Sequence, residues 1–595
     1  MNPSGSRRRV LRHLAGLSAL PAFLHLPRGA QAAEAAAATT TGPGDVPWQE
    51  LAAAVRELIR VRSPLTECAR GGNCDAIFAA VKNPYFTGDD VALTQTLGWV
   101  DAWTTQASPY AVAAYDWRDV ATAVNFAREH RLRLAVKGGG HSYQGTSNAA
   151  DSLLIWTRRM HATELHEAFV PAGCEGRIAP ARAVSVGAGA MWSQVYDAVT
   201  TRGGGYVQGG GCLSVGVAGL IQSGGFGSFS KAFGLAAASL LEAELVTADG
   251  ERRIANACTH PDLFWALKGG GGGSFGVVTR LTLQVHELPE TFGAVNFTVR
   301  AGSPEAFRRL IALALDQYAD RMFNPHWGEQ IRVRRGNVLE IAMVFQGLTR
   351  GEAADVWEPL FKATDAAGSD YSVDFSPLKI VATSARDFWA PTLIKRTFGF
   401  IKRDDRPGAA ETNVFWPGDQ GQAGQVVHGY QSTWLPARLL ASGQRGALVD
   451  ALFAASRHWH VSLHVNKGLA GASPGVIAAA RDTATNPVVL EAFALAISGA
   501  EEQPAYPGVP GHEPDVALAR TRAQAIAQAA TELRRLVPEA GSYLAESDYF
   551  EADWRRAFWG SNYERLAQVK ATYDPQGLFT VHHGVGSPDT PPRKA

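Results

Sequence analysis

The sequence predicts an α+β protein built around large buried cores, and two observations support this fold class. First, 46% of the 595 residues are hydrophobic and 15 are tryptophan, so the chain can bury extensive apolar surface. Second, alternating apolar residues predict strands, and these stand beside segments with a helical pattern. The predicted strands cover 132–136, 184–186, 241–245 and 277–285, and the predicted helices cover 191–200 and 261–268. At about 150 residues per domain, the length corresponds to two to four domains.

Charge and apolar runs argue against two classes of partner. The net charge is zero at pH 7 and the pI is about 7.3, whereas capture of nucleic acid requires a basic surface. After the N-terminal segment no run of about 18 apolar residues appears, so we expect no membrane span. The histidines near 460 and 582 lack the spacing of metal-binding motifs, so we expect no metal site.

The N-terminus has the pattern of a targeting signal. Arginines at 7–9 precede an apolar stretch over 14–26 and a small-residue cleavage pattern. We therefore expect a twin-arginine signal peptide over 1–32, with an ordinary secretory signal as the alternative. The mature protein would then be periplasmic or secreted, without membrane attachment. Residues 33–109 are expected to form a leader and an N-terminal extension.

The glycines carry positional information. The chain holds 62 glycines, and average usage of about 7% would give about 20 fewer. Four clusters account for the surplus, at 137–145, 187–189, 203–227 and 269–276. Glycine permits positive φ and close approach of the backbone to a ligand, and successive backbone N–H groups bind anions. We therefore expect one long phosphate-containing ligand held by main chain; the alternative is four unrelated turns.

A nicotinamide-binding Rossmann domain is the main rival interpretation. Gly271, Gly273 and Gly276 match the G-x-G-x-x-G spacing. That fingerprint requires a strand, a turn and a helix in this order. Here a predicted helix precedes the glycines and a predicted strand follows them, so we reject this interpretation. An α/β-hydrolase is rejected too, because no G-x-S-x-G motif is present.

Two of the glycine clusters contain a reactive side chain, His141 and Cys212. His141 follows three glycines in a loop, 137–145, that resembles the R-G-G-G-H-S-Y-x-G loop of berberine-bridge-enzyme-like flavoproteins of the vanillyl-alcohol-oxidase superfamily. Cys212 lies in a segment similar to the family's G-x-C-P-T-V-G-x-G-G. Residues 262–278 and 562–579 resemble two further segments of the same family, and the best match within it is the isoamyl-alcohol-oxidase-like branch.

The resemblance implies a domain plan. It predicts a PCMH-type FAD-binding domain with two subdomains over 110–286. A substrate domain over 287–540 would consist of an antiparallel sheet backed by helices. A berberine-bridge-type segment over 541–587 would return to the FAD domain, and 588–595 would be a tail.

The resemblance also implies the cofactor and its attachment. FAD would be held bicovalently, through its 8α methyl group by His141 and through ring carbon 6 by Cys212. The sequence departs from the family at Lys137, where arginine is usual. Val215 occupies the position where valine accompanies reactivity with oxygen. The expected cofactor-binding residues are Lys137, Gly138, Gly139, Gly140, His141, Ser142, Gly145, Gly189, Gly210, Gly211, Cys212, Val215, Gly216, Gly219, Gly225, Gly227, Gly276, Val278 and Tyr573.

The other four cysteines receive structural roles. Cys68 and Cys74 are close in sequence and flank a glycine-rich stretch, so we expect them to form a disulfide. Cys174 and Cys258 are expected to be isolated thiols.

The catalytic candidates lie in the second half of the chain. Tyr543 resembles a tyrosine of the family's returning segment and is our first choice for the proton-accepting base. A free tyrosine has a pKa of about 10, so it would need a neighbouring cation such as Lys467. His460, Ser462, His464 and Asn466 share one face of a predicted strand over 459–467. This row is expected to be solvated; the alternative is a pocket face on which His464 or Asn466 binds substrate hydroxyls.

We therefore expect an exported FAD-dependent oxidase that converts an alcohol or sugar hydroxyl to a carbonyl, with oxygen reduced to hydrogen peroxide. The first alternative is a dehydrogenase that uses another electron acceptor. The second is a noncatalytic flavin- or carbohydrate-binding module.

Overall fold

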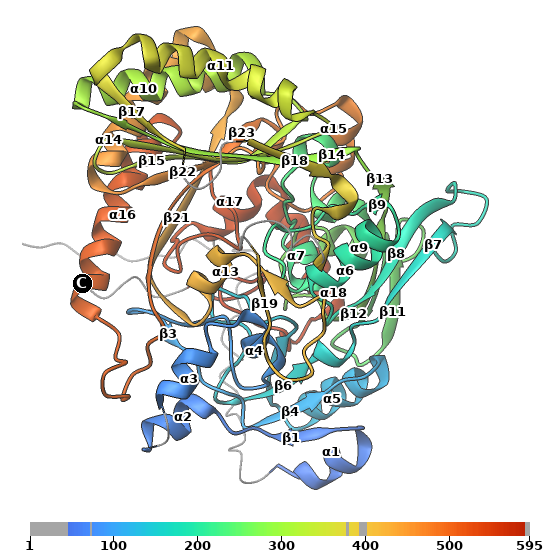
Figure 1. Ribbon diagram of the computed structural model, residues 1–595. Coiled ribbons are helices and arrows are strands. Elements are labelled where there is room, and N and C mark those ends of the chain that lie inside the picture. The colour runs from blue at the N-terminus through green and yellow to red at the C-terminus, as the bar shows by residue number, and fades with distance from the viewer. Residues whose placement is uncertain (1–45, 72–73, 376–379, 392–400, 590–595) are drawn as a thin grey trace, which may run out of the picture. The chain divides into compact units, whose positions relative to one another are not determined.

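The computed structural model describes residues 46–71, 74–375, 380–391 and 401–589, all of them within the compact unit Thr41–Ala595 (Figure 1). The predicted signal peptide over 1–32 lies outside these residues. Within the described ranges, no helix is both long and apolar enough to span a bilayer, and no cluster of three or more potential metal ligands occurs.

Two small sheets lie in the first half of the chain. The four-stranded sheet has the order β1 (Leu58–Arg60), β4 (Tyr110–Ala113), β6 (Ser152–Trp156) and β5 (Arg133–Lys137), with β6 parallel to both of its neighbours. The five-stranded sheet has the order β11 (Arg252–Asn256), β10 (Leu240–Val246), β12 (Val277–Gln284), β8 (Ala181–Gly187) and β7 (Thr163–Phe169), and all of its pairs are antiparallel. The strands predicted over 132–136, 184–186, 241–245 and 277–285 are found here.

A ten-stranded sheet dominates the second half. Its order is β17 (Tyr371–Asp374), β14 (Thr291–Ala301), β16 (Val338–Gln346), β15 (Trp327–Arg334), β22 (Val461–His464), β23 (Ala492–Glu502), β21 (Gln425–Pro436), β2 (Thr96–Trp99) and β3 (Trp103–Thr104), and β18 (Ile380–Ser384) also pairs with β14. Every described pair is antiparallel except β2 with β21. The N-terminal extension therefore supplies β1 to the four-stranded sheet and β2–β3 to this one.

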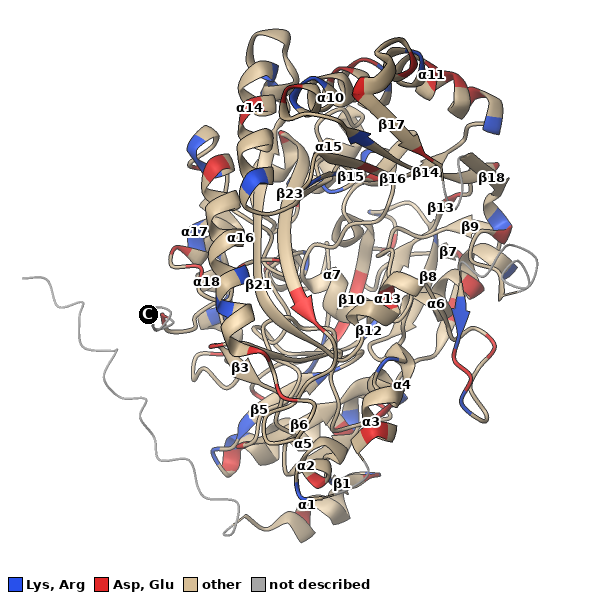
Figure 2. Cartoon of the chain, turned by 60° about the vertical axis from the view of Figure 1, so that its left-hand side comes forward, with Lys and Arg blue, Asp and Glu red and all other residues tan. Residues whose placement is uncertain are grey.

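Helices cover one face of the ten-stranded sheet (Figure 1). They are α10 (Pro304–Gln317), α11 (Arg350–Ala366), α14 (Ser442–His458) and α16 (Val516–Leu536). Each presents apolar residues at helical spacing to the sheet, as Phe307, Leu310 and Ile311 of α10 do. Their outer surfaces mix both signs of charge (Figure 2), in keeping with the zero net charge.

The remaining elements are short. The helices are α1 (Trp48–Ala54), α2 (Pro64–Ala69), α3 (Cys74–Ala80), α4 (Pro84–Asp89), α5 (Trp117–Glu129), α6 (Trp192–Tyr196), α7 (Val217–Gln222), α8 (Ser230–Phe233), α9 (Pro261–Leu267), α13 (Pro417–Gln422), α15 (Pro474–Arg481), α17 (Trp554–Trp559) and α18 (Tyr563–Tyr573). Two further strand pairs join β9 (Gly205–Tyr206) to β13 (His286–Glu287) and β19 (Lys402–Arg403) to β20 (Val414–Phe415).

The loop between β19 and β20 is tied to α4 by one buried carboxylate. Asp404 accepts hydrogen bonds from Asn83 Nδ2 at 2.7 Å and Asn413 Nδ2 at 3.0 Å, and it is ion-paired with Arg406 at 2.6 Å. Burial opposes the charge of Asp404, but the hydrogen bonds from Arg406, Asn413 and Asn83 outweigh it and hold its pKa at about 2.

Four of the five cysteines form disulfides. Cys68 is bonded to Cys74, as expected, with Cα atoms 5.2 Å apart. Cys174 is bonded to Cys258, with Cα atoms 5.6 Å apart, so the expectation of isolated thiols is wrong. The two residues are 84 positions apart in sequence, and the fold brings the loop after β7 against the end of β11, which no local pattern reveals.

Candidate functional site

The glycine clusters converge on one cavity of about 360 Å³. Its other wall is formed by residues from the C-terminal segment, including Tyr543, Glu546, Trp559 and His583. Eleven of the sequence-predicted cofactor-binding residues line the cavity: Gly138, Gly139, Gly140, His141, Ser142, Cys212, Val215, Gly216, Gly219, Gly276 and Val278. The structure thus brings His141 and Cys212, from separate clusters, to one ligand space.

A direct crossing of two backbones explains why glycine is needed at the centre of the site. A Cβ atom on Gly139 would lie 2.8 Å from the backbone nitrogen of Gly216, and one on Gly216 would lie 2.9 Å from the nitrogen of Gly139. Real Cβ atoms do not approach backbone this closely. The crossing places the loop that carries His141 against the loop that carries Cys212.

The other predicted glycines serve packing. Gly145, Gly189, Gly210, Gly211, Gly225 and Gly227 do not line the cavity. Gly145 makes room for the ring of Trp103, because a Cβ there would lie 2.5 Å from it. Gly189 makes room for the carbonyl oxygen of Thr157, at 2.0 Å from the corresponding Cβ position.

Lys137 and Tyr573 bond to protein groups and are not among the residues that line the cavity, so their predicted contact with a cofactor stays a prediction. Lys137 is fully buried, and its Nζ donates hydrogen bonds to the carbonyl oxygens of Asp90, Val91 and Leu93 at 2.6, 3.1 and 2.6 Å. Tyr573 donates its hydroxyl proton to Asp262 Oδ1 at 3.0 Å. Motif matching gives their positions in the chain but does not reveal the hydrogen bonds that their side chains make with protein.

The pKa values of His141 and Cys212 are shifted in opposite directions. Burial lowers the pKa of His141 to about 4, so its imidazole is neutral at pH 7 and one ring nitrogen keeps a free electron pair. Ser214 Oγ lies 3.2 Å from its Nε2. Burial, followed by the negative charge of Asp419, raises the pKa of the Cys212 thiol well above its usual range.

Several cavity features fit a large ligand with polar groups. His583 is 5% exposed, and neither ring nitrogen has a hydrogen-bond partner among the described residues. Gln144 Oε1 is buried there without a partner in the same described set. A Cβ on Gly219 would meet no protein atom within 4 Å and would instead enter the cavity. Unpaired polar atoms and an open glycine cradle are what FAD would fill.

An acid–base cluster borders the same cavity. The ammonium of Lys467 is ion-paired with the carboxylate of Glu546, and its Nζ lies 5.9 Å from the centre of the Tyr543 ring. Burial and the charge of Glu546 raise the pKa of Tyr543. The expected lowering of this pKa by Lys467 is therefore not found, because Lys467 is committed to Glu546.

The row of polar side chains predicted over 459–467 differs from the expectation, because β22 covers only part of this segment and two of its polar side chains are buried. Ser462 and Asn466 are 8% and 5% exposed, so a solvated row is wrong for both. Ser462 Oγ donates to Gln330 Oε1 at 3.1 Å, and Asn466 Nδ2 donates to the carbonyl oxygen of Gly227 at 3.1 Å. His464 pairs with Gln330 across the sheet and does not line the cavity. Burial lowers the pKa of His464 well below its usual range.

Sequence reasoning missed three residues of the site: Glu546, Asp419 and His583. Glu546 lies three positions after Tyr543, and an ionisable residue this close to a predicted base is a usable signal. Asp419 comes from α13, far from any recognised motif, and only the fold places it beside Cys212.

Comparisons with known proteins agree with this geometry. Residues 109–256 match the family described as "FAD binding domain", and residues 542–586 match "Berberine and berberine like". The FAD-linked oxidoreductase ffsJ of Aspergillus flavipes is 30% identical over 484 residues, which cover 79% of this chain and 74% of that protein.

Solved structures share the fold. A VAO-type flavoprotein from Myceliophthora thermophila C1 superposes with a TM-score of 0.74 at 22% identity, covering 92% of this chain and 97% of that one. A glucooligosaccharide oxidase from Acremonium strictum superposes with a TM-score of 0.61 at 19% identity, covering 83% and 95%. That oxidase contains a 6-S-cysteinyl, 8α-N1-histidyl FAD.

Proposed function

Because the chain belongs to the berberine-bridge-enzyme-like family of FAD-linked oxidoreductases, we propose that it is an oxidase with FAD linked to both His141 and Cys212. It oxidises an alcohol or sugar hydroxyl to a carbonyl and reduces oxygen to hydrogen peroxide. The observation that carries this proposal is that His141 and Cys212, from separate loops, line one cavity together with the carboxylate of Glu546.

The chemistry divides between cofactor and chain. FAD, when bound, supplies a hydride acceptor. The chain must remove the hydroxyl proton, and we assign this to Glu546, whose carboxylate lines the cavity and is ion-paired with Lys467. Tyr543 also lines the cavity, but its raised pKa keeps it protonated, so it serves as a hydrogen-bond donor to substrate oxygen.

Different observations support oxygen as the electron acceptor and a sugar hydroxyl as the substrate. Val215 lines the cavity, at the position where valine accompanies oxygen reactivity in this family. The structural neighbours include glucooligosaccharide, chitooligosaccharide and xylooligosaccharide oxidases, which supports a sugar hydroxyl as substrate. Export is also part of the proposal and rests on the sequence pattern at 1–32.

Peptide masses test the attachment. Protein purified with its yellow colour is denatured in acid and digested, and the peptides that contain positions 141 and 212 are weighed. We expect one FAD to join these two peptides. In His141→Ala with Cys212→Ala, the colour should wash out on denaturation. A wild-type digest in which both peptides have their unmodified masses would refute the covalent site.

Flavin reoxidation tests the acceptor. The protein is reduced anaerobically by substrate chosen from a screen of alcohols and sugars with peroxide detection, and air is then admitted. An oxidase recovers its absorbance within seconds and releases hydrogen peroxide. Flavin that stays bleached for minutes in air, yet reoxidises with an artificial acceptor, identifies a dehydrogenase instead.

A further inference from the structure

We propose that Asp419 is the proton acceptor for Cys212 when the link between this cysteine and FAD forms. The inference rests on the bicovalent attachment proposed above. It assigns a role in the maturation of the protein to a residue outside the substrate site.

The geometry around α13 places Asp419 against the cysteine. Asp419 is 6% exposed, and its carboxylate lies close enough to the Cys212 thiol to raise the pKa of that thiol. The backbone N–H groups of Trp416 and Leu213 donate to the same carboxylate, the first at 3.2 Å to Oδ2. Trp416 Nε1 donates to the carbonyl oxygen of Gly211 at 2.9 Å. These contacts fix the carboxylate beside Sγ.

Cys212 requires such a partner. Cys212 is half-buried, and its charged neighbours are the carboxylates of Asp419, Glu329 and Glu546, all of which disfavour a thiolate. The thiolate is the nucleophilic form of cysteine. Burial raises the pKa of Asp419 to about 6, so Asp419 is still mostly ionised at pH 7 and is close to the value at which a general base works best.

The step balances with oxygen as oxidant. The S–H bond of Cys212 and the C–H bond at flavin ring carbon 6 break, and one S–C bond forms. Two protons and two electrons are released. Asp419 takes the thiol proton and the second proton passes to solvent. Dioxygen then accepts the two electrons together with two protons, one returned by Asp419 and one from solvent, and leaves as hydrogen peroxide, so the ring ends in its oxidised form.

The state of Cys212 can be measured selectively by thiol labelling. All five cysteines lie within the described residues, and Cys212 is the one outside the two disulfides. Iodoacetamide added to denatured, unreduced protein therefore labels Cys212 only where it carries no FAD. Asp419→Asn should slow linkage by about 100-fold. Protein purified soon after synthesis should then hold FAD through His141 alone and take up one iodoacetamide label.

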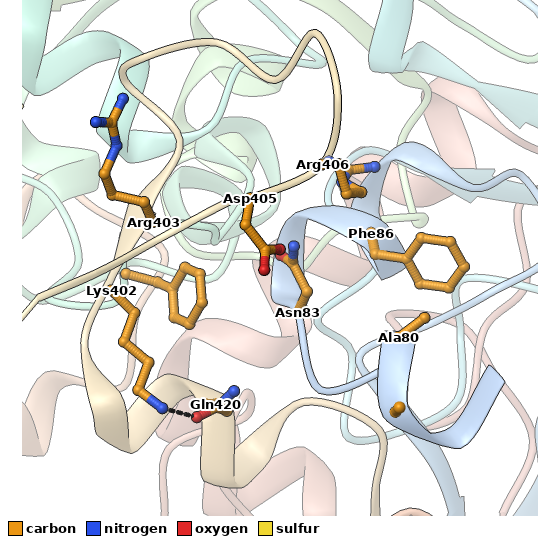
Figure 3. Close-up of a pocket in the computed structure, with 10 residues that line it drawn as sticks. Ala80, Asn83, Phe86, Lys402, Arg403, Asp405, Arg406 and Gln420 are labelled. Carbon is orange, nitrogen blue, oxygen red and sulfur yellow. Dashed lines mark hydrogen bonds between the residues drawn. The ribbon is translucent and has the colours of Figure 1, made fainter. Parts of the chain in front are cut away.

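Two matched variants separate chemistry from packing. Asp419→Glu and Asp419→Gln add the same methylene, so a packing defect affects both, and they differ in the carboxylate. We expect labelled Cys212 in the Gln variant and linked Cys212 in the Glu variant. Gln420→Ala, on the same helix, removes the hydrogen bond from Lys402 at a second cavity of about 590 Å³ and should leave both links intact (Figure 3).

The outcomes distinguish this inference from the proposed function. Unlinked Cys212 in wild-type protein overturns both. Linked Cys212 in the wild type and equally fast linkage in the Asn and Gln variants overturn the role of Asp419 alone. Loss of linkage in the Asn and Gln variants, with retention in the Glu and Gln420→Ala variants, supports it.

Discussion

Replacing Gly139 by alanine should disrupt the crossing of the two loops that carry His141 and Cys212. The new Cβ would lie 2.8 Å from the nitrogen and 3.2 Å from the Cα of Gly216, and 3.2 Å from the carbonyl oxygen of Ser214. All three contacts are with backbone, which cannot rotate away as a side chain can. Overpacking of this kind costs about 1–3 kcal/mol.

Gly219→Ala is the matched control, because it adds the same methyl group to the same cavity wall. Its Cβ meets no protein atom within 4 Å. Gly219 lies inside α7, where alanine favours the helix by about 0.5–1 kcal/mol. The two variants should therefore move stability in opposite directions, while both reduce FAD incorporation.

The assay compares the unfolding free energies of wild type and both variants, measured with urea on protein prepared without FAD. A second measurement gives covalent FAD per chain after expression with excess riboflavin. We expect Gly139→Ala to unfold at lower urea and Gly219→Ala at equal or higher urea. Wild-type stability in Gly139→Ala would refute the close crossing, and full FAD content in Gly219→Ala would show that the ligand lies elsewhere.

Four further predictions concern single groups. Glu546→Gln should lower kcat/KM by about 100-fold or more with both FAD links intact by mass; unchanged turnover would remove it as the base. Cys174→Ser should lower the free energy of unfolding by up to about 4.5 kcal/mol, because its bond to Cys258 closes a loop of 84 residues. Wild type in reductant should lose at least as much, since it also loses the bond between Cys68 and Cys74; unchanged stability of Cys174→Ser would contradict this. The pKa of Asp404 is held at about 2, below its value of about 3.9 in the unfolded chain, so its contribution to stability is present above pH 4 and is lost between pH 4 and pH 2. The melting temperature of Asp404→Asn should therefore fall less steeply than that of the wild type over this window. Parallel melting curves for the two proteins would contradict this. Lys137→Met should leave buried carbonyl groups unpaired and cost about 1–3 kcal/mol while FAD content per folded chain stays normal; selective loss of FAD would instead favour a cofactor contact.

Local patterns predicted local structure well. The helix expected over 261–268 is α9 (Pro261–Leu267), and the strand expected over 277–285 is β12 (Val277–Gln284). Both follow from apolar periodicity over a few residues. The sequence singled out His141 and Cys212 because they sit inside contiguous glycine-rich motifs, and both line the cavity.

Contacts between residues that are distant in sequence could not be predicted, because they depend on how the whole chain folds. Cys174 pairs with Cys258 because two distant loops meet, and β2 pairs with β21 across more than half of the chain. Motif matching located Lys137 without revealing that its ammonium group is bonded to backbone carbonyl oxygens of the N-terminal extension. Asp419 has no local signature, since its role depends on the contact with Cys212 that folding creates.

The wall of the cavity formed by 543–584 has a consequence for the order in which the protein is made. His141 and Cys212 leave the ribosome long before this wall does. The cavity has its second wall only once residues 543–584 are in place, so the complete site requires both ends of the folded chain. A truncation before Ser542 would keep His141 and Cys212 yet lack this wall.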